Sequence, residues 1–180
     1  LEDDAMLVSD LSDVLHAVSS LKDIDYLSLE IRNRKKLLSK RSRVLDSKYK
    51  IYRLYQDRSG AAAYVLWPSG AKKLLTRSKK FAALSDAMIC MSYDLLGFQI
   101  EPACAVQLDS AKYYGLKASI KSISTIHSGV NIGRPDLSQS NGIKFKLRRI
   151  LSQIKMGYRF LSNIFIAKKR YVKFDIKRFQ

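Results

Sequence analysis

The chain begins Leu1-Glu2-Asp3-Asp4-Ala5-Met6-Leu7-Val8, where three adjacent carboxylates precede a short apolar run. Adjacent carboxylates repel one another unless a positive group lies among them. The flanking apolar residues predict that the acidic residues lie at the end of a buried strand, at the edge of a site. Such a position suits a divalent cation that also binds phosphates. The alternative is a solvated acidic turn that caps the next helix. Because no methionine precedes the cluster, we expect the chain to start within a larger protein.

Composition limits the class of protein. The chain has 180 residues, of which 47% are hydrophobic and three are proline, so we expect a folded domain with a sizeable core. Cys90 and Cys104 lie in apolar surroundings, which predicts buried free thiols and favours a reducing compartment. No charge-free apolar run is long enough to predict a transmembrane helix.

The positive charge is concentrated at the C-terminal end. The net charge is +17, from 33 basic and 16 acidic residues. Twelve of the basic residues but only one acidic residue, Asp175, lie from residue 144 to residue 180. Such asymmetry indicates an anionic partner, either a membrane surface or nucleic acid.

Alternating and helical spacings of apolar residues indicate an α/β fold. Helices are predicted over residues 7–21, 71–76 and 85–95, with Gly97 ending the third, and strands over 25–31, 49–55, 64–67, 98–102 and 104–107. The basic residues 32–43 are interpreted as a solvated loop or short helix. A stretch rich in Ser, Gly and Asn predicts a linker over residues 129–142. The linker would join a domain of residues 1–128 to a helical tail of residues 143–180.

Four segments then fall in the order of a known set of motifs. The segment Leu1-Glu2-Asp3-Asp4-Ala5 resembles the Glu-Asp-Asp signature of glycosyltransferase family 25, the lipooligosaccharide glycosyltransferases, which also include collagen galactosyltransferases. Residues 59–65 and 69–75 resemble its small-residue strand and the Gly-Ala-basic-basic-Leu-Leu helix that follows. Ser85-Asp86 stands where the family has a Pro-hydrophobic-Asp motif, although Leu84 and Ser85 depart from it. Residues 101–107, with Ser119-Ile120, resemble the closing segment.

The resemblance covers roughly residues 1 to 120 and implies an inverting transfer of a sugar from a nucleotide sugar to a hydroxyl. It implies a partial GT-A-like domain whose first strands precede the chain. A divalent cation, Mn²⁺ or Mg²⁺, is expected to neutralise the diphosphate leaving group. Glu2 and Asp4 are expected to hold it, because alternate residues of an extended segment point the same way. Asp3 is expected to bind ribose or sugar hydroxyls.

An inverting transfer also needs a general base for the acceptor hydroxyl. Asp86 is the predicted base, because a helix N-terminus favours an ionised carboxylate; a plain helix cap is the alternative, and Asp94 is a weaker candidate base. Gly60, Ala61 and Tyr64 are expected to line the donor and acceptor site. Tyr64 and Trp67 are either sugar-stacking rings or core residues. His16 and His127 have no partner motif and are interpreted as structural or surface residues.

The tail resembles a basic amphipathic helix at a membrane interface. One helical face carries apolar residues from Leu147 to Phe165, and the other carries basic and polar ones. Packing against the domain is the alternative, and RNA binding is disfavoured because the aromatic pattern of common RNA modules is absent. The sequence therefore predicts a bacterial enzyme at the cytoplasmic face of the inner membrane, moving galactose from UDP-galactose to a lipooligosaccharide core or other glycan. The other hypothesis is a non-catalytic module that binds a membrane or nucleic acid.

Overall fold

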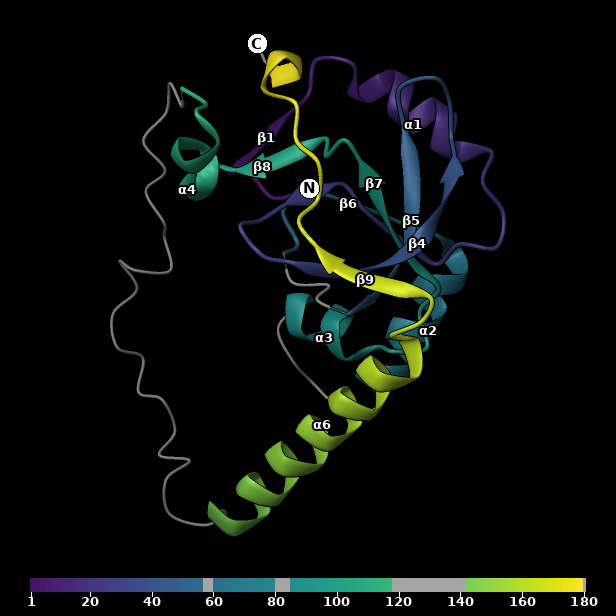
Figure 1. The fold of residues 1–180 in the computed structure, drawn as a ribbon, viewed down its shortest axis with the longest axis vertical. Helices are drawn as coiled ribbons and strands as arrows, with labels where there is room; N and C mark the ends of the chain where they lie inside the picture. The colour runs from purple at the N-terminus through teal and green to yellow at the C-terminus, as the bar shows by residue number, and fades with distance from the viewer. Residues whose placement is uncertain (57–59, 80–84, 118–141, 180) are drawn as a thin grey trace. The chain divides into compact units, whose positions relative to one another are not determined.

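The computed structural model describes residues 1–56, 60–79, 85–117 and 142–179 (Figure 1). The chain divides into two compact units. The main unit comprises Leu1–Ile120 together with Ile166–Gln180, and the second unit is Lys121–Phe165. Among the described residues, no helix combines the length and the apolar character needed to span a bilayer.

A mixed six-stranded sheet forms the centre of the main unit, with strand order β6-β2-β7-β5-β4-β9. Strands β2 and β7 are parallel, and the other neighbouring pairs are antiparallel. The strands are β2 (Tyr26–Ser28), β4 (Lys36–Val44), β5 (Lys50–Gln56), β6 (Tyr64–Leu66), β7 (Gly97–Glu101) and β9 (Ala167–Arg170).

A smaller three-stranded sheet, in the order β1-β8-β3, holds the start of the chain. Its strands are β1 (Ala5–Leu7), β8 (Ala105–Gln107) and β3 (Glu30–Ile31). Strand β1 runs antiparallel to β8, which places Ala5 opposite Gln107. The pairing brings the acidic residues before β1 next to the end of β8, although about a hundred residues separate them in the sequence.

Short helices complete the main unit. They are α1 (Leu11–Ser19), α2 (Pro68–Ser78), α3 (Ser85–Met91), α4 (Leu108–Ala111) and the 3-10 turns η1 (Lys112–Tyr114) and η2 (Ile176–Phe179). Val14 and Val18 face the core from α1, one turn apart, as helical spacing requires. The described part of the second unit contains α6 (Gly142–Asn163).

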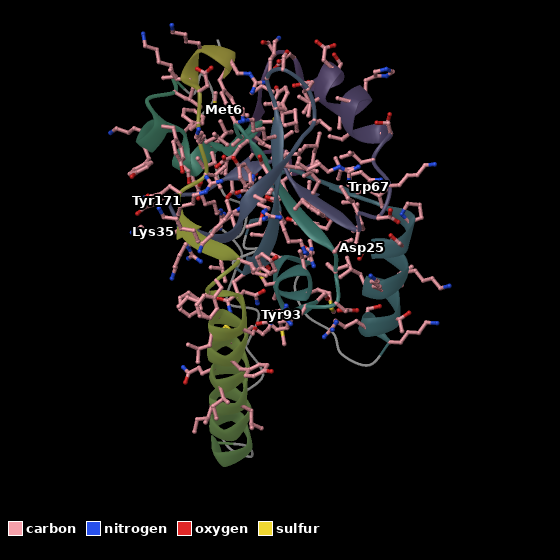
Figure 2. The ribbon with its side chains drawn as sticks, turned by 45° about the vertical axis from the view of Figure 1, so that its right-hand side comes forward. Met6, Asp25, Lys35, Trp67, Tyr93 and Tyr171 are labelled. Carbon is pink, nitrogen blue, oxygen red and sulfur yellow. The ribbon has the colours of Figure 1, made fainter. Side chains whose placement is uncertain are left out.

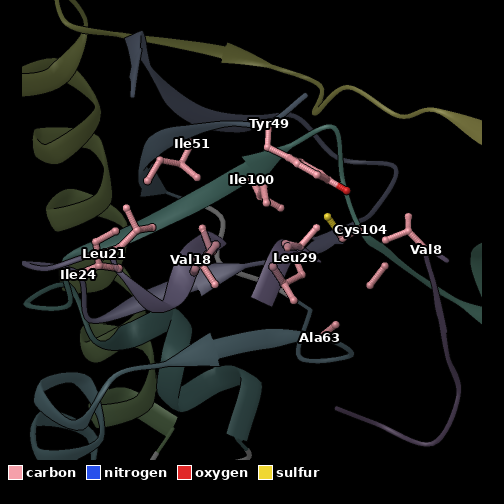
Figure 3. Packing of buried hydrophobic residues seen from close by; sticks show 13 residues of the cluster. Val8, Val18, Leu21, Ile24, Leu29, Tyr49, Ile51, Ala63, Ile100 and Cys104 are labelled. Atoms are coloured by element: carbon pink, nitrogen blue, oxygen red, sulfur yellow. The ribbon is translucent and has the colours of Figure 1, made fainter. Parts of the chain in front are cut away.

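Two clusters of buried side chains form the core of the main unit. The first joins α1 to the sheet and includes Val18, Leu29, Tyr49, Ile100 and Cys104 (Figure 3). The second joins α3 to the C-terminal segment through Ile89, Leu95 and Val172, among others. Cys104 is buried as predicted, whereas Cys90 is half-buried, and both are free thiols.

The interpretation of residues 32–43 as a solvated loop or short helix is wrong. These residues supply most of β4, and Lys36, Leu37 and Leu38 are buried in it. The start of β4 is covered because β5 and β9 pair with it on either side. The second half of β4 is exposed and basic.

Two predicted ends are also wrong. The third helix stops at Met91, and Gly97 begins β7. The helical tail ends at Asn163, after which β9 pairs with β4 and residues 166–180 belong to the main unit. The predicted linker lies almost entirely in residues 118–141, which are outside the described residues.

Candidate functional site

The acidic residues form a turn that is tied to two other segments. The Glu2 N–H donates to the Ala62 carbonyl at 2.8 Å, and the Asp4 carbonyl accepts the Leu108 N–H at 2.9 Å. Asp3 and Asp4 lie in a turn rather than in an extended segment, and β1 begins immediately after them. Asp3 is exposed in the same turn. The backbone on both sides of Asp3 is thus held, at Glu2 by the segment before β6 and at Asp4 by the start of α4.

The carboxylates of Glu2 and Asp4 share one hydrogen-bond donor, the side-chain amide nitrogen of Gln107. Gln107 Nε2 donates to Glu2 Oε2 at 3.3 Å and to Asp4 Oδ2 at 3.0 Å. The other Asp4 oxygen, Oδ1, is buried and has no hydrogen-bond partner within the part of the chain that the structure describes. Two carboxylates therefore converge, although the extended backbone assumed from the sequence is absent.

Arg32 binds the Gln107 side chain and is itself bound by the buried Glu30. The Arg32 guanidinium donates to Gln107 Oε1, and its Nε donates to Glu30 Oε1 at 2.9 Å. Glu30 is 1% exposed, and its second oxygen accepts the Ala62 N–H at 3.0 Å. Burial raises the pKa of Glu30, while Arg32, the Ala62 N–H and Lys36 act in the opposite direction.

The small residues of the second signature allow this close contact. Gly60 has a φ of +96°, and a Cβ at this position would overlap the Glu30 carboxylate. Ala61, Ala62 and Ala63 are buried behind it. Gly60 therefore lies against Glu30, where any side chain would displace the carboxylate.

A polar cluster without solvent access supports the backbone of Glu30. Lys36 Nζ donates to Ser28 Oγ at 3.2 Å, to the Glu30 carbonyl at 3.3 Å and to Gln99 Oε1 at 2.6 Å. Gln99 Nε2 in turn donates to the carbonyls of Ser28 and Glu30. Lys36 and Gln99 are 1% and 0% exposed. Buried groups that are satisfied in this way rigidify the segment that they contact.

The predicted aromatic residues are packed against other side chains. The Tyr64 ring lies 5.5 Å from that of Tyr26, centroid to centroid. Trp67 precedes α2 and packs against the first core cluster (Figure 2). Both rings therefore contribute to the core, and Tyr64 keeps a half-buried face.

The two candidate bases lie apart from this network. Asp86 lies in the first turn of α3, where its Oδ1 accepts the Ala87 N–H at 2.6 Å. Asp94 lies after α3, is 51% exposed and pairs with Arg77 at 3.0 Å. No hydrogen bond between described residues connects either aspartate to Glu2 or Asp4. His16 is exposed on α1, as interpreted from the sequence, and His127 is outside the described residues.

Two carboxylates suit a cation that receives its other ligands from elsewhere. In the described ranges, no group of three or more His, Cys, Asp or Glu side chains is arranged to hold a metal. Mg²⁺ at phosphate-transferring sites typically binds one or two carboxylates together with waters and substrate phosphates. Glu2, Asp4 and the partnerless Asp4 Oδ1 provide hard oxygen ligands of this kind. The donor set thus fits Mg²⁺ or Mn²⁺ shared with a diphosphate.

Sequence reasoning missed Glu30 and Arg32. The signal for Glu30 was a carboxylate between Leu29 and Ile31 inside a predicted strand, where an unpaired charge is costly. Arg32 pairs locally with Glu30, but its contact with Gln107, which is 75 residues away, has no local signal.

The acidic turn, the glycine and alanine segment and Asp86 all fall within one family match. The model of glycosyltransferase family 25, described as LPS biosynthesis protein, matches residues 1–91, which is half of the chain. The chain therefore belongs to glycosyltransferase family 25, and the family implies glycosyltransferase activity in lipopolysaccharide biosynthesis, with a sugar donor and a glycan acceptor. No curated protein and no solved structure matches the chain.

Proposed function

We propose that the protein transfers galactose from UDP-galactose to a lipooligosaccharide or lipopolysaccharide core, or to a related glycan, through a metal-dependent inverting reaction in a GT-A-like domain. The observation that carries this proposal is the convergence of Glu2 and Asp4 on Gln107, beside the segment Gly60–Ala63. Three segments that resemble family signatures and are far apart in sequence lie together there, next to an Asp4 oxygen that has no hydrogen-bond partner among the described residues.

Each residue has a separate role in the proposed reaction. Glu2 and Asp4 would bind Mn²⁺ or Mg²⁺, which supplies neutralisation of the diphosphate leaving group. Asp3, exposed in the same turn, would accept hydrogen bonds from ribose or sugar hydroxyls. Gly60 and Ala61 keep the backbone close to Glu30 and leave no side chain over the donor. The exposed edge of Tyr64 would contact the sugar.

The acceptor hydroxyl must lose its proton as it attacks the anomeric carbon. We assign this proton to the Asp86 carboxylate, and the bond to the diphosphate breaks on the opposite face of the sugar. Asp86 lies in the first turn of α3, where its carboxylate is half-buried and accepts the Ala87 N–H. Asp94 is the weaker candidate, because its carboxylate is already paired with Arg77.

Donor and metal dependence are tested with the full-length protein and radiolabelled UDP-galactose. We expect transfer to a lipopolysaccharide acceptor with Mn²⁺ or Mg²⁺, and its loss with EDTA. Asp4→Asn should lower kcat/KM by about 100-fold or more, in the range of electrostatic contributions to transition states. Asp13→Asn is the control, because Asp13 is an exposed carboxylate on α1. Activity that survives both EDTA and Asp4→Asn would contradict the metal assignment.

We further propose that the second unit holds the enzyme on the anionic cytoplasmic face of the bacterial inner membrane. Apolar side chains of α6 at three- and four-residue spacing are exposed, namely Ile150, Ile154, Tyr158 and Leu161. Leu161 is 63% exposed and Tyr158 is 72% exposed. An amphipathic helix of this type binds an interface by burying its apolar face, and nearby Lys and Arg residues add electrostatic attraction.

Vesicles containing phosphatidylglycerol test this surface. Leu161→Glu should weaken vesicle binding several-fold, whereas Leu75→Glu should not, because Leu75 is equally exposed, at 65%, but lies on α2. Replacing residues 121–165 with a Gly-Ser linker should abolish binding and leave the main unit intact. Salt-sensitive binding of duplex RNA by this deletion variant, without vesicle binding by the whole chain, would favour the nucleic-acid hypothesis.

A further inference from the structure

We infer that Glu30 and Arg32 are positioning residues, which set the orientation of the Glu2 and Asp4 carboxylates through Gln107. The inference rests on the proposed function, since it gives these carboxylates their role as cation ligands. Neither Glu30 nor Arg32 belongs to a family signature identified in the sequence. Both residues act through another side chain and would not touch the donor.

The hydrogen bonds around the site form a closed ring. The Glu2 N–H donates to the Ala62 carbonyl, and the Ala62 N–H donates to Glu30 Oε2. Arg32 then donates to both Glu30 Oε1 and Gln107 Oε1. Gln107 Nε2 closes the ring by donating to Glu2 Oε2. Asp4 Oδ2 joins the ring at Gln107. The ring holds both the backbone and the side chain of Glu2, so the Glu2 carboxylate cannot turn without losing its hydrogen bond with Gln107.

Arg32 also determines which way the Gln107 amide faces. A glutamine amide presents an acceptor at one end and two donors at the other. Because the guanidinium donates to Oε1, the NH₂ end must face the two carboxylates. Without Arg32, Oε1 loses this donor, and the amide is held only by its contacts with the two carboxylates. The planar guanidinium presents Nε to Glu30 and Nη2 to Gln107 in a fixed fork, and a lysine ammonium, with a single nitrogen, does not reproduce that geometry.

Glu30 keeps Arg32 in place. Its carboxylate is 1% exposed and is held by the Ala62 N–H as well as by Arg32 Nε, while the adjacent backbone is supported by Lys36. Arg32 is 29% exposed and would otherwise sample several rotamers. The buried carboxylate therefore orders the arginine, the arginine orders the amide, and the amide orders the two ligands.

Groups that hydrogen-bond to metal ligands typically change metal affinity or activity by 10- to 100-fold when they are mutated. We therefore expect Arg32→Lys to raise the Kd for Mn²⁺, measured by electron paramagnetic resonance, by about 10-fold. Arg170→Lys is the matched control. Arg170 is 24% exposed and pairs with Glu101, a carboxylate that is 3% exposed, and its hydrogen bonds to described residues, Glu101 and Tyr171, do not involve the ring. Gln107→Met serves as the second variant, since it removes the amide without touching the Arg32–Glu30 pair.

A second readout needs no metal. In ¹H–¹⁵N spectra of the full chain, the Gln107 Nε2 protons should shift in Arg32→Lys and remain unchanged in Arg170→Lys. Equal Mn²⁺ affinities for wild type and Arg32→Lys, or unchanged Gln107 resonances in Arg32→Lys, would overturn the inference. An equal loss of affinity in Arg170→Lys would also overturn it, because the effect would then be one of general stability.

The two proposals fail in different ways. If wild type and Asp4→Asn bind Mn²⁺ equally, or wild type does not bind it, the cation assignment is wrong, and the Gln107 resonances alone decide whether Arg32 positions the amide. If Asp4→Asn loses Mn²⁺ but Arg32→Lys and Gln107→Met keep it, the cation site stands and the positioning role is rejected.

Discussion

At Gly60, one backbone conformation and one missing side chain make room for Glu30. The φ of +96° is a value that residues with a side chain rarely adopt, and the space that a Cβ would need is taken by the carboxylate. The positive φ and the lack of space for a Cβ therefore each favour glycine at residue 60. The family signature of small residues followed by tyrosine describes, in this chain, the close approach of backbone to a buried acid.

Gly60→Ala should lower the free energy of unfolding by about 1–3 kcal/mol, because a non-glycine residue is strained at this φ and would also displace Glu30. Urea denaturation followed by circular dichroism measures the change. Gly157→Ala is the control, since a Cβ there meets nothing within 4 Å and alanine favours the helix. A Gly60→Ala protein as stable as wild type would contradict the proposed close contact.

Cys104 should resist alkylation. Burial, together with the charge of Asp10, raises the pKa of its thiol to about 12, so that about one molecule in 10⁴ carries the thiolate at pH 8. Iodoacetamide followed by mass spectrometry should label Cys90, which is half-buried, well before Cys104. Both thiols should react at similar rates in urea. Faster labelling of Cys104 than of Cys90 in the native protein would contradict the packing described here.

Among the elements, β2 and α2 are joined through Asp25. Lys73 Nζ contacts Asp25 Oδ2 at 2.5 Å, the Leu96 N–H donates to the same oxygen at 2.7 Å, and the Asp25 carbonyl accepts the Trp67 N–H at 3.0 Å (Figure 2). A Cβ at Gly70 would overlap this carbonyl, so the first turn of α2 packs directly on the backbone of Asp25. One buried carboxylate thus orients a helix and the start of β7.

These contacts predict a pH dependence of stability. Burial alone would raise the pKa of Asp25, but hydrogen bonds from Leu96, Lys73 and Ser69 outweigh it and leave the pKa below its ordinary value of 3.8. The ionised form is therefore favoured by folding, and its contribution is present above pH 3.8 and is lost as the pH falls through the lowered pKa.

Asp25→Asn should accordingly lower the free energy of unfolding at neutral pH, and the difference from wild type should shrink below pH 3.8. Urea denaturation across this pH range measures it. Asp13→Asn, at an exposed site on α1, is the control. A difference that stays constant down to pH 2 would show that the Asp25 charge is not responsible.

The elements differ in how well the sequence predicted them. Strand β5 and helix α1 follow from periodic apolar residues, which in β5 reach both core clusters, Ile51 in the first and Leu54 in the second. Strand β4 did not, because its buried start, Lys36–Leu38, is followed by five exposed residues. Its pairing with β9 joins residues that are more than 120 positions apart, and no local pattern encodes that partner. In the site, Glu2 and Asp4 were visible as a motif, whereas the contact between Arg32 and Gln107 depends entirely on tertiary structure.

At the scale of the molecule, the last residues of the chain complete the main unit. Arg170 makes a two-pronged contact with Glu101, whose carboxylate also accepts the Lys173 N–H at 2.9 Å. Arg178 pairs with Asp10 at 2.5 Å and lies 4.3 Å from the centre of the Tyr49 ring. Two arginines that the sequence analysis assigned to a membrane-binding tail therefore hold the C-terminal segment to the core.

Arg170→Ala should cost about 3–5 kcal/mol of unfolding free energy, because it leaves the buried Glu101 carboxylate without its charge partner. Lys169→Ala, on the exposed neighbouring residue of β9, should change it by less than about 0.5 kcal/mol. Thermal or urea denaturation of both variants distinguishes the two effects. Equal stability of the two variants would mean that the C-terminal segment does not anchor the sheet.

The Arg170–Glu101 contact also sets a minimum time for folding during synthesis on the ribosome. Glu101 leaves the ribosome 69 residues ahead of the arginine that neutralises it. At about 5–20 residues per second, the nascent protein waits roughly 3–14 s with this carboxylate unpaired and the outer edge of β4 open. The outer edge of β4 can be covered only after residues 167–170 have been made, so a premature stop between α6 and β9 would leave a chain that cannot complete this sheet.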